Sequence, residues 1–243
     1  MILKLSVLVF SVLQIAAAAF LSLGTFETET RDLSVYVQPA GWTFGVWGVI
    51  YALSLVYGVY QILPGKDNQL VMSTRFPALI AFGGSIMWLW LAGFDNGLVW
   101  LTIPVLFSMA IALTHVVVAS EKFHDRSTIL FSKLILLPYA AWTAIACWLN
   151  IPVLLIDQSV VTSGTINYIL NLAIFACIAG VVIFFYKKSN KSVWYGAVVV
   201  WATIGIFTVN YTSGNYIFAV AAAALGMYVV IHWLLYRSKR ILW

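Results

Sequence analysis

The sequence of 243 residues predicts an all-α polytopic membrane protein with eight transmembrane helices. Hydrophobic residues make up 63% of the chain and charged residues 9%, whereas about a quarter of the residues in a soluble domain are charged. Eight apolar stretches lack Lys, Arg, Asp and Glu, and at about 20 residues each can cross the hydrocarbon of a bilayer as a helix. These stretches are Leu5–Leu23, Gly41–Leu63, Phe76–Phe94, Leu98–Ser120, Leu134–Ile156, Ile166–Tyr186, Val193–Tyr211 and Tyr216–Tyr236.

The distribution of Lys and Arg supports the count of eight and predicts an orientation. With alternating helices and a cytoplasmic N-terminus, twelve of the 13 cations fall in cytoplasmic segments and Arg31 falls outside, as the positive-inside bias requires. Both termini are then cytoplasmic, which fits a bacterial inner membrane, with an organelle membrane as the alternative. The net charge of +5 thus indicates contact with anionic lipid rather than nucleic acid.

The first stretch has two interpretations. Lys4 before an apolar run and the small residues Ala16–Ala19 also fit a signal peptide. We expect a retained helix, because the run is long for a signal peptide and because its retention keeps both termini on one side. The segment Gly24–Ala40, which follows, is predicted to be an outer loop and contains Arg31.

The second stretch combines small and aromatic residues. Its small residues recur at helical spacing and predict a face on which a neighbouring backbone can come close. Trp47 and Tyr51 lie four residues apart and predict an aromatic ridge on another face. The small residues are Gly41, Gly45, Gly48 and Ala52.

The third and fourth stretches add Trp88, Trp90 and His115. Indole rings at this depth either fill space between helices or line a polar pocket, because an indole N–H in hydrocarbon needs a partner. His115 could ligate haem or relay protons, but it has no carboxylate nearby in the sequence. We expect it to form an ordinary hydrogen bond within the bundle.

The fifth stretch holds a second cluster of aromatic and polar residues. Pro138 lacks the N–H that a helix needs at that position, which predicts a kink. Tyr139 and Trp142 are three residues apart and share a face. Asn150 is polar within an apolar run, and such groups tend to face the bundle interior or a cavity.

The last three stretches carry Asn167, Asn171, Trp201 and Asn210. We expect their polar side chains to form hydrogen bonds between helices rather than a second binding site. The chain is predicted to divide near Asp157 into an N-terminal five-helix part, residues 1–156, and a three-helix extension, residues 157–243.

Two motifs resemble the translocator protein family, also called the tryptophan-rich sensory proteins (TspO/MBR). One is Pro-Ala-Gly-x-Thr-Phe-Gly-Val-Trp-x3-Tyr at 39–51, and the other is Pro-Tyr-x2-Trp-x7-Asn at 138–150. They lie on the second and fifth helices, as in that five-helix family, and Trp88 and Trp90 suit its Trp-rich third helix. The resemblance covers residues 1–156.

The resemblance implies a pocket for porphyrins, haem-like tetrapyrroles, sterols or synthetic aromatic ligands. Trp47 and Trp142 would be its wall, Tyr139 would line it, and Pro39 would shape the access loop. Two departures stand out: Ser85 occupies the place of an Asn three residues before a Trp, and three helices follow Ile156. Homodimers are typical of the family, and Gly83, Gly84 and Gly93 would permit close helix packing.

The leading hypothesis is reversible binding of a flat apolar ligand, with a tetrapyrrole or another pigment as the first candidate, by a sensor or carrier. The alternative is a structural or assembly subunit of a larger membrane complex. No residue set specifies a catalytic reaction or a metal site, and an enzymatic role is conceivable by resemblance only. The candidate binding residues are Trp47, Trp142, Tyr139, Pro39, Tyr51, Trp88, Ser85, Asn150 and Arg31.

Overall fold

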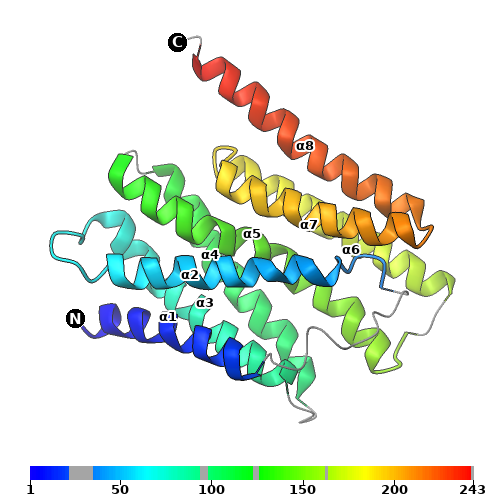
Figure 1. The fold of residues 1–243 in the computed structure, drawn as a ribbon, viewed down its shortest axis with the longest axis horizontal. Helices are drawn as coiled ribbons and strands as arrows, with labels where there is room; N and C mark the ends of the chain where they lie inside the picture. Colours follow the sequence, from blue (N-terminus) through cyan, green and yellow to red (C-terminus); the bar gives the residue numbers. More distant parts are fainter. Residues whose placement is uncertain (22–34, 94–97, 123–125, 162–163, 242–243) are drawn as a thin grey trace.

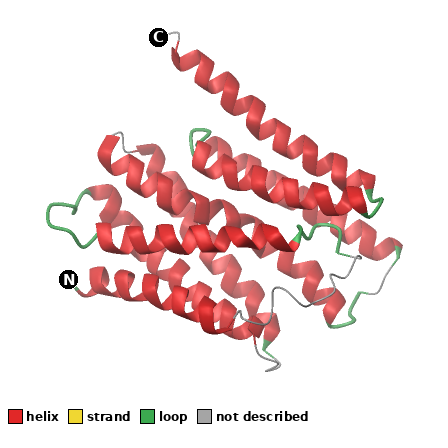
Figure 2. Cartoon of the chain, in the orientation of Figure 1, coloured by secondary structure: helices red, strands yellow, loops and turns green. Residues whose placement is uncertain are grey.

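A computed structural model describes residues 1–21, 35–93, 98–122, 126–161 and 164–241. Helices account for every regular element in these ranges (Figures 1 and 2). Eight spans are long and apolar enough to cross a membrane, which confirms the predicted fold class. The elements are α1 (Ile2–Leu21), η1 (Gly41–Gly45), α2 (Val46–Tyr60), α3 (Gln69–Gly93), η2 (Val99–Leu101), α4 (Thr102–Lys122), α5 (Arg126–Asp157), α6 (Thr165–Lys188), α7 (Val193–Thr212) and α8 (Tyr216–Ile241).

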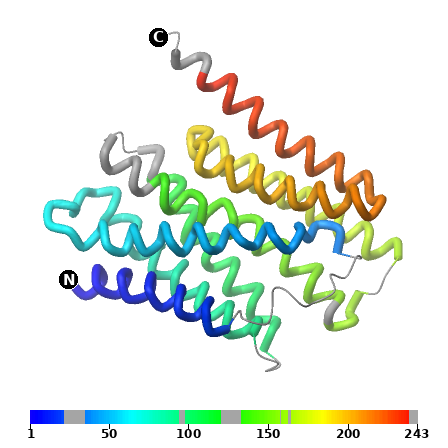
Figure 3. Tube along the Cα trace, in the orientation of Figure 1, coloured from blue at the N-terminus to red at the C-terminus, as the bar shows by residue number. Residues whose placement is uncertain are grey.

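Successive helices alternate in direction, so that α1 begins and α8 ends towards the same end of the bundle (Figure 1). Helix α8 packs mainly on α7 and diverges from the other helices towards its C-terminal end (Figure 3). Helices α6 and α7 pack against α5. Helices α6 and α7 therefore join the C-terminal part to the central helix, and α8 packs on the outside of α7.

Helix α5 is the centre of the bundle. It contacts α2, α3, α4, α6 and α7, and its apolar part, Lys133–Ile156, is the most buried of the eight spans. Trp142 and Tyr139 are fully buried on it. A helix that is enclosed on several sides needs apolar residues around its whole circumference, which accounts for the Ala-rich sequence around these two rings.

Helix α3 begins at Gln69, earlier than the predicted start at Phe76, and so includes a buried cation. The Arg75 guanidinium donates to the side chain and the backbone carbonyl of Gln61, at 2.9 and 3.0 Å, and pairs with Asp67. Asp67 also pairs with Lys4 of α1. These partners offset the cost of burying a charge, so the helix can start before its apolar stretch.

Helix α1 is an integral part of the bundle and packs on α2 and α3. The Cα of Gly58 on α2 comes so close to α1 that an added Cβ would collide with Ser11. The Gln61 side chain of the α2 C-terminus donates to the Lys4 carbonyl at 2.7 Å. These contacts suit a retained helix.

The prediction that Gly41, Gly45 and Gly48 admit a neighbouring backbone is wrong for the described part of this chain. A Cβ added at any of the three would meet nothing within 4 Å among the described residues, and all three are exposed, as is Ala52. The physical reason lies in Trp47 and Tyr51. Their large rings occupy the side of α2 that faces the protein, which leaves the small residues on the outside.

The glycines of α3 that were expected to permit a dimer are used within the chain instead. Gly83 faces Phe10 of α1, and Gly84 faces Met109 of α4 so closely that a Cβ would collide with it. Gly93 lies beside Leu21. Close packing at these positions therefore joins α3 to its own neighbours.

Candidate ligand-binding site

Aromatic rings from three helices converge around Trp47. We call Trp47, Tyr51, Trp88, Tyr139 and Trp142 the aromatic cluster. The Trp47 ring is stacked on Tyr51 and Trp88, with centroid distances of 5.3 and 5.8 Å. Tyr139 and Trp142 meet it edge-on at 5.8 and 6.3 Å, within the range of favourable aromatic pairs. The two motifs that are distant in the sequence thus form one buried cluster.

Polar side chains hold the margins of the cluster in place. The hydroxyls of Tyr51 and Ser85 are hydrogen-bonded at 2.9 Å. The Trp88 indole N–H donates to the Asn150 side-chain oxygen at 3.4 Å, and the Asn150 amide donates to the Ala146 carbonyl at 2.9 Å. Ser85 and Asn150 therefore position rings of the cluster.

Two indole N–H groups at the centre of the cluster are buried without a partner in the described structure. They belong to Trp47 and Trp142. A buried donor without an acceptor costs about 1–3 kcal/mol. The aromatic cluster is therefore rich in donors and poor in acceptors.

A third such donor belongs to Gln14 of α1, which the sequence analysis did not single out. Its side chain is fully buried, its Oε1 lies 3.3 Å from the Tyr139 hydroxyl, and its Nε2 has no partner within the described ranges. The Tyr139 hydroxyl also donates to the Ala81 carbonyl at 3.0 Å. The signal for Gln14 was available, because an amide inside a transmembrane stretch tends to face the bundle or a cavity.

The start of the second transmembrane span, beside the cluster, is held by the C-terminal helices. Pro39 lies outside the cluster and packs against Gly205 of α7, where the Ala40 N–H donates to the Gly205 carbonyl at 3.3 Å. The Trp201 indole N–H donates to the Thr43 carbonyl at 2.8 Å. Phe44 of η1 then meets Trp142 edge-on at 5.7 Å, so this contact connects α7 to the cluster.

Asparagines of α6 and α7 fix the segment that precedes η1. The Val37 N–H donates to the Asn171 side-chain oxygen at 3.3 Å, and the Asn210 amide donates to the Tyr36 carbonyl at 2.7 Å. These amides thus bind the segment before η1, whereas hydrogen bonds between helices were expected. Arg31, the predicted outer cation, lies outside the described residues.

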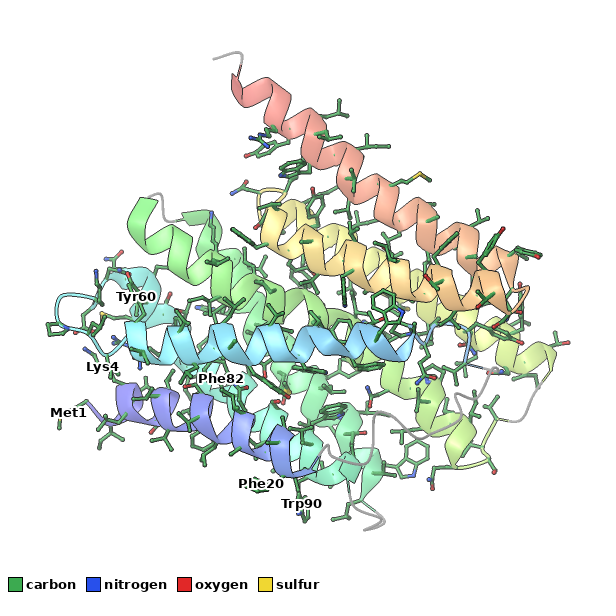
Figure 4. The ribbon with its side chains drawn as sticks, viewed as in Figure 1. Met1, Lys4, Phe20, Tyr60, Phe82 and Trp90 are labelled. Carbon is green, nitrogen blue, oxygen red and sulfur yellow. The ribbon has the colours of Figure 1, made fainter. Side chains whose placement is uncertain are left out.

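Other aromatic residues of interest face outward. The Trp90 side chain is 46% exposed and projects from the edge of the bundle, whereas Phe82 lies among the helices (Figure 4). Trp201 is partly exposed and packs edge-on against Trp42. His115 lies on the exposed face of α4. It is therefore not inside the bundle, where its hydrogen bond was expected.

A cavity of about 220 Å³ lies on the other side of α5 from the aromatic cluster. It is lined by α4, α5 and α6 and by Tyr195 of α7. None of the predicted site residues in the described ranges lines it. The central helix therefore separates two features, a filled aromatic cluster and an open cavity.

Comparison with known protein families places the chain in one of them. A family model described as TSPO-like protein matches residues 1–235. The chain belongs to the TSPO-like family. No curated protein and no solved structure matches it. The resemblance in the sequence covered residues 1–156, whereas the family match includes α6 and α7 of this TSPO-like protein and most of α8.

Proposed function

We propose that this TSPO-like protein reversibly binds a flat, largely apolar ligand at the aromatic cluster, as a sensor or carrier. The observation that carries the proposal is the pair of buried indole N–H groups, on Trp47 and Trp142, that have no acceptor in the described structure. The family resemblance makes a tetrapyrrole, such as a porphyrin or a haem-like pigment, the first candidate.

The chemistry of the cluster suits a planar molecule with acceptor atoms. Apolar ring area that leaves water or lipid headgroups contributes about 25 cal/mol per Å². Each donor that gains an acceptor contributes about 1 kcal/mol. A tetrapyrrole offers both a large flat face and oxygen or nitrogen acceptors, which the two indoles and Gln14 would meet.

Binding requires the rings to separate. Trp47 and Trp88 are nearly parallel, at 27°, with centroids 5.8 Å apart, whereas a planar ligand between two rings needs about 7 Å, two van der Waals contacts of roughly 3.5 Å. The Trp88 hydrogen bond to Asn150 is long, at 3.4 Å. We therefore expect Trp88 to move when the ligand enters.

The test is a titration of the purified protein in detergent with protoporphyrin IX, followed by porphyrin absorption. This readout does not depend on the number of Trp residues. The variant combines Trp47→Phe and Trp142→Phe, and the matched control combines Trp90→Phe and Trp100→Phe, two exposed indoles. Loss of two hydrogen bonds of about 1 kcal/mol each should weaken binding by roughly thirtyfold.

The control should retain the affinity of the original protein. Equal weakening in both double variants would show that porphyrin partitions non-specifically onto surface indoles. Unchanged affinity in the Trp47→Phe/Trp142→Phe variant would place binding elsewhere. Either result would refute the proposed site.

The second candidate function is a structural or assembly subunit of a larger membrane complex. The specific observation in its favour is the exposed small-residue face of α2, where Gly41, Gly45 and Gly48 meet no described neighbour. Purification in mild detergent tests it. A stoichiometric partner that is lost on Gly48→Leu would select this function, and a chain that elutes alone would dismiss it.

We also propose that the end of the bundle with both termini faces the cytoplasm of a bacterial inner membrane. The sorted cations support this orientation. In a background without Cys147 and Cys177, a membrane-impermeant maleimide should label Ser213→Cys in intact cells and Lys66→Cys only after lysis. The reverse pattern would invert the orientation.

A further inference from the structure

The cavity beside α5 is apolar and is bounded on one side by residues that face the bilayer. Its walls include Phe107 and Ile111 of α4, Ala144 and Trp148 of α5, and Phe185 of α6. Ile111 is 67% exposed and therefore stands at the margin between the cavity and the lipid. A molecule dissolved in the bilayer could reach this cavity from the side.

One polar group in the lining is unusual. The Tyr195 side chain is fully buried, and its hydroxyl has no hydrogen-bond partner anywhere in the described chain. The other hydroxyl and thiol in the lining are satisfied locally, since Thr114 donates to the Ile111 carbonyl at 2.6 Å and Cys147 to the Ala144 carbonyl at 3.5 Å.

Comparison with another buried tyrosine shows that this fold can satisfy such a hydroxyl. Tyr186 is buried on α6, and its hydroxyl donates to the Val229 carbonyl of α8 at 3.0 Å. The Tyr195 hydroxyl has no such acceptor. An unpaired buried hydroxyl costs about 1–3 kcal/mol, and Tyr195 stands in the wall of the cavity, so a ligand acceptor that reaches its hydroxyl would recover this cost.

We propose that this cavity is a second binding site, for a compact apolar molecule of one or two rings with a carbonyl oxygen that accepts from the Tyr195 hydroxyl. The volume sets the size: an apolar cavity of ~150 Å³ holds benzene, so about 220 Å³ admits a bicyclic ring system. Sites for larger ligands have at least ~300 Å³, which excludes a tetrapyrrole.

The apolar lining is the reason for proposing a carbonyl group on the ligand. A ligand hydroxyl that accepted from Tyr195 would bring a proton for which the side chains of the lining offer only the Thr114 oxygen and the weakly accepting Cys147 sulfur, whereas a carbonyl brings no donor. The site is distinct from the aromatic cluster, which faces the other side of α5, and it is independent of the proposed function.

The experiment measures binding of three naphthalenes to the full-length protein in detergent by equilibrium dialysis. They are 2-acetylnaphthalene, with a carbonyl, 1-(2-naphthyl)ethanol, with a hydroxyl, and 2-ethylnaphthalene, with neither. One hydrogen bond corresponds to a roughly two- to tenfold gain in affinity. We expect the ketone to bind more tightly than the hydrocarbon by this factor, and the alcohol to bind more weakly than the ketone.

Two variants separate the polar contact from the cavity. Tyr195→Phe should abolish the preference for the ketone and leave 2-ethylnaphthalene binding unchanged, whereas Tyr186→Phe, the matched control, should keep the preference. Ala144→Leu should weaken all three ligands at least fivefold by filling the cavity. If that variant does not fold, Ala110→Leu reaches the same space from α4.

Persistence of the ketone preference in Tyr195→Phe would overturn the proposal, as would unchanged affinity in the folded cavity-filling variant. The Trp47→Phe/Trp142→Phe variant distinguishes the two sites. It should bind 2-acetylnaphthalene normally and protoporphyrin IX poorly, and Tyr195→Phe should show the opposite pattern. Loss of both ligands in either variant would contradict two separate sites.

Discussion

Substitution of Gly205 by Ala should weaken the junction between α7 and the start of the second transmembrane span. A Cβ at Gly205 would collide with the Thr43 side chain and lie 3.0 Å from the Pro39 Cβ. Overpacking of this kind costs about 1–3 kcal/mol. The gain in helix propensity from Gly to Ala, about 1 kcal/mol, offsets part of it. The net loss should therefore reach about 2 kcal/mol.

The matched control is Gly180→Ala on α6. A Cβ there would meet nothing within 4 Å among the described residues, so this variant keeps the gain in propensity and has no described collision. Thermal unfolding in detergent should show Gly205→Ala below the original protein and Gly180→Ala at or above it. The two changes are chemically identical, so the difference between them isolates the packing at Gly205.

A double-mutant cycle assigns the collision to Thr43. Thr43→Ala removes two of the three nearest atoms that a Cβ at Gly205 would meet, and the third, the Pro39 Cβ, remains. Gly205→Ala should therefore be less destabilising by at least about 1 kcal/mol in the Thr43→Ala background, because neighbouring sites couple. Additive effects, or stabilisation by Gly205→Ala equal to that of Gly180→Ala, would refute the packing argument.

Two further predictions concern hydrogen bonds and charge. Tyr195→Phe should leave the midpoint of thermal unfolding unchanged or raise it. Tyr186→Phe loses a paired hydroxyl and should lower the free energy of unfolding by about 1 kcal/mol. The opposite ranking of the two variants would contradict the assigned pairing. Lys4, and next Arg75, hold the pKa of the Asp67 carboxyl below its usual 3.8. A lowered pKa means that this stabilisation is present above pH 3.8 and lost as pH falls through the folded-state value. Asp67→Asn should therefore flatten the acid limb of a stability–pH profile, and an unchanged limb would show that the two ion pairs contribute nothing.

The residues of α2 and α5 show how far a sequence pattern reaches. The spacing of Trp47 and Tyr51 placed both rings on one face of a helix, and they are stacked at 5.3 Å. The motifs on two distant helices predicted convergence, and Trp142 lies edge-on to Trp47. Helical periodicity determines the first relation, because a face is a local property of the chain, whereas the convergence of the two motifs was implied by the family resemblance.

The same reasoning failed where a face had to be assigned to a neighbour. Gly41, Gly45 and Gly48 have the spacing of a packing face and lie on the outside. Gly205 was not singled out in the sequence, yet it permits the close approach of α7 to Pro39 and Thr43. A small residue allows close packing at any surface, and only the arrangement of the other helices decides which surface meets one.

By itself, the sequence determined the number of transmembrane helices and the apolar part of each, since bilayer thickness sets how many apolar residues a span needs and the charged residues mark where each apolar run ends. It also determined which aromatic residues share a helix face. Only the tertiary structure decided that Gln14 contacts the aromatic cluster, that α7 holds the start of the second span, and that Tyr195 lines a cavity without a hydrogen-bond partner in the described chain. These features depend on contacts between residues far apart in the sequence, and no local pattern records which acceptor a buried donor will meet.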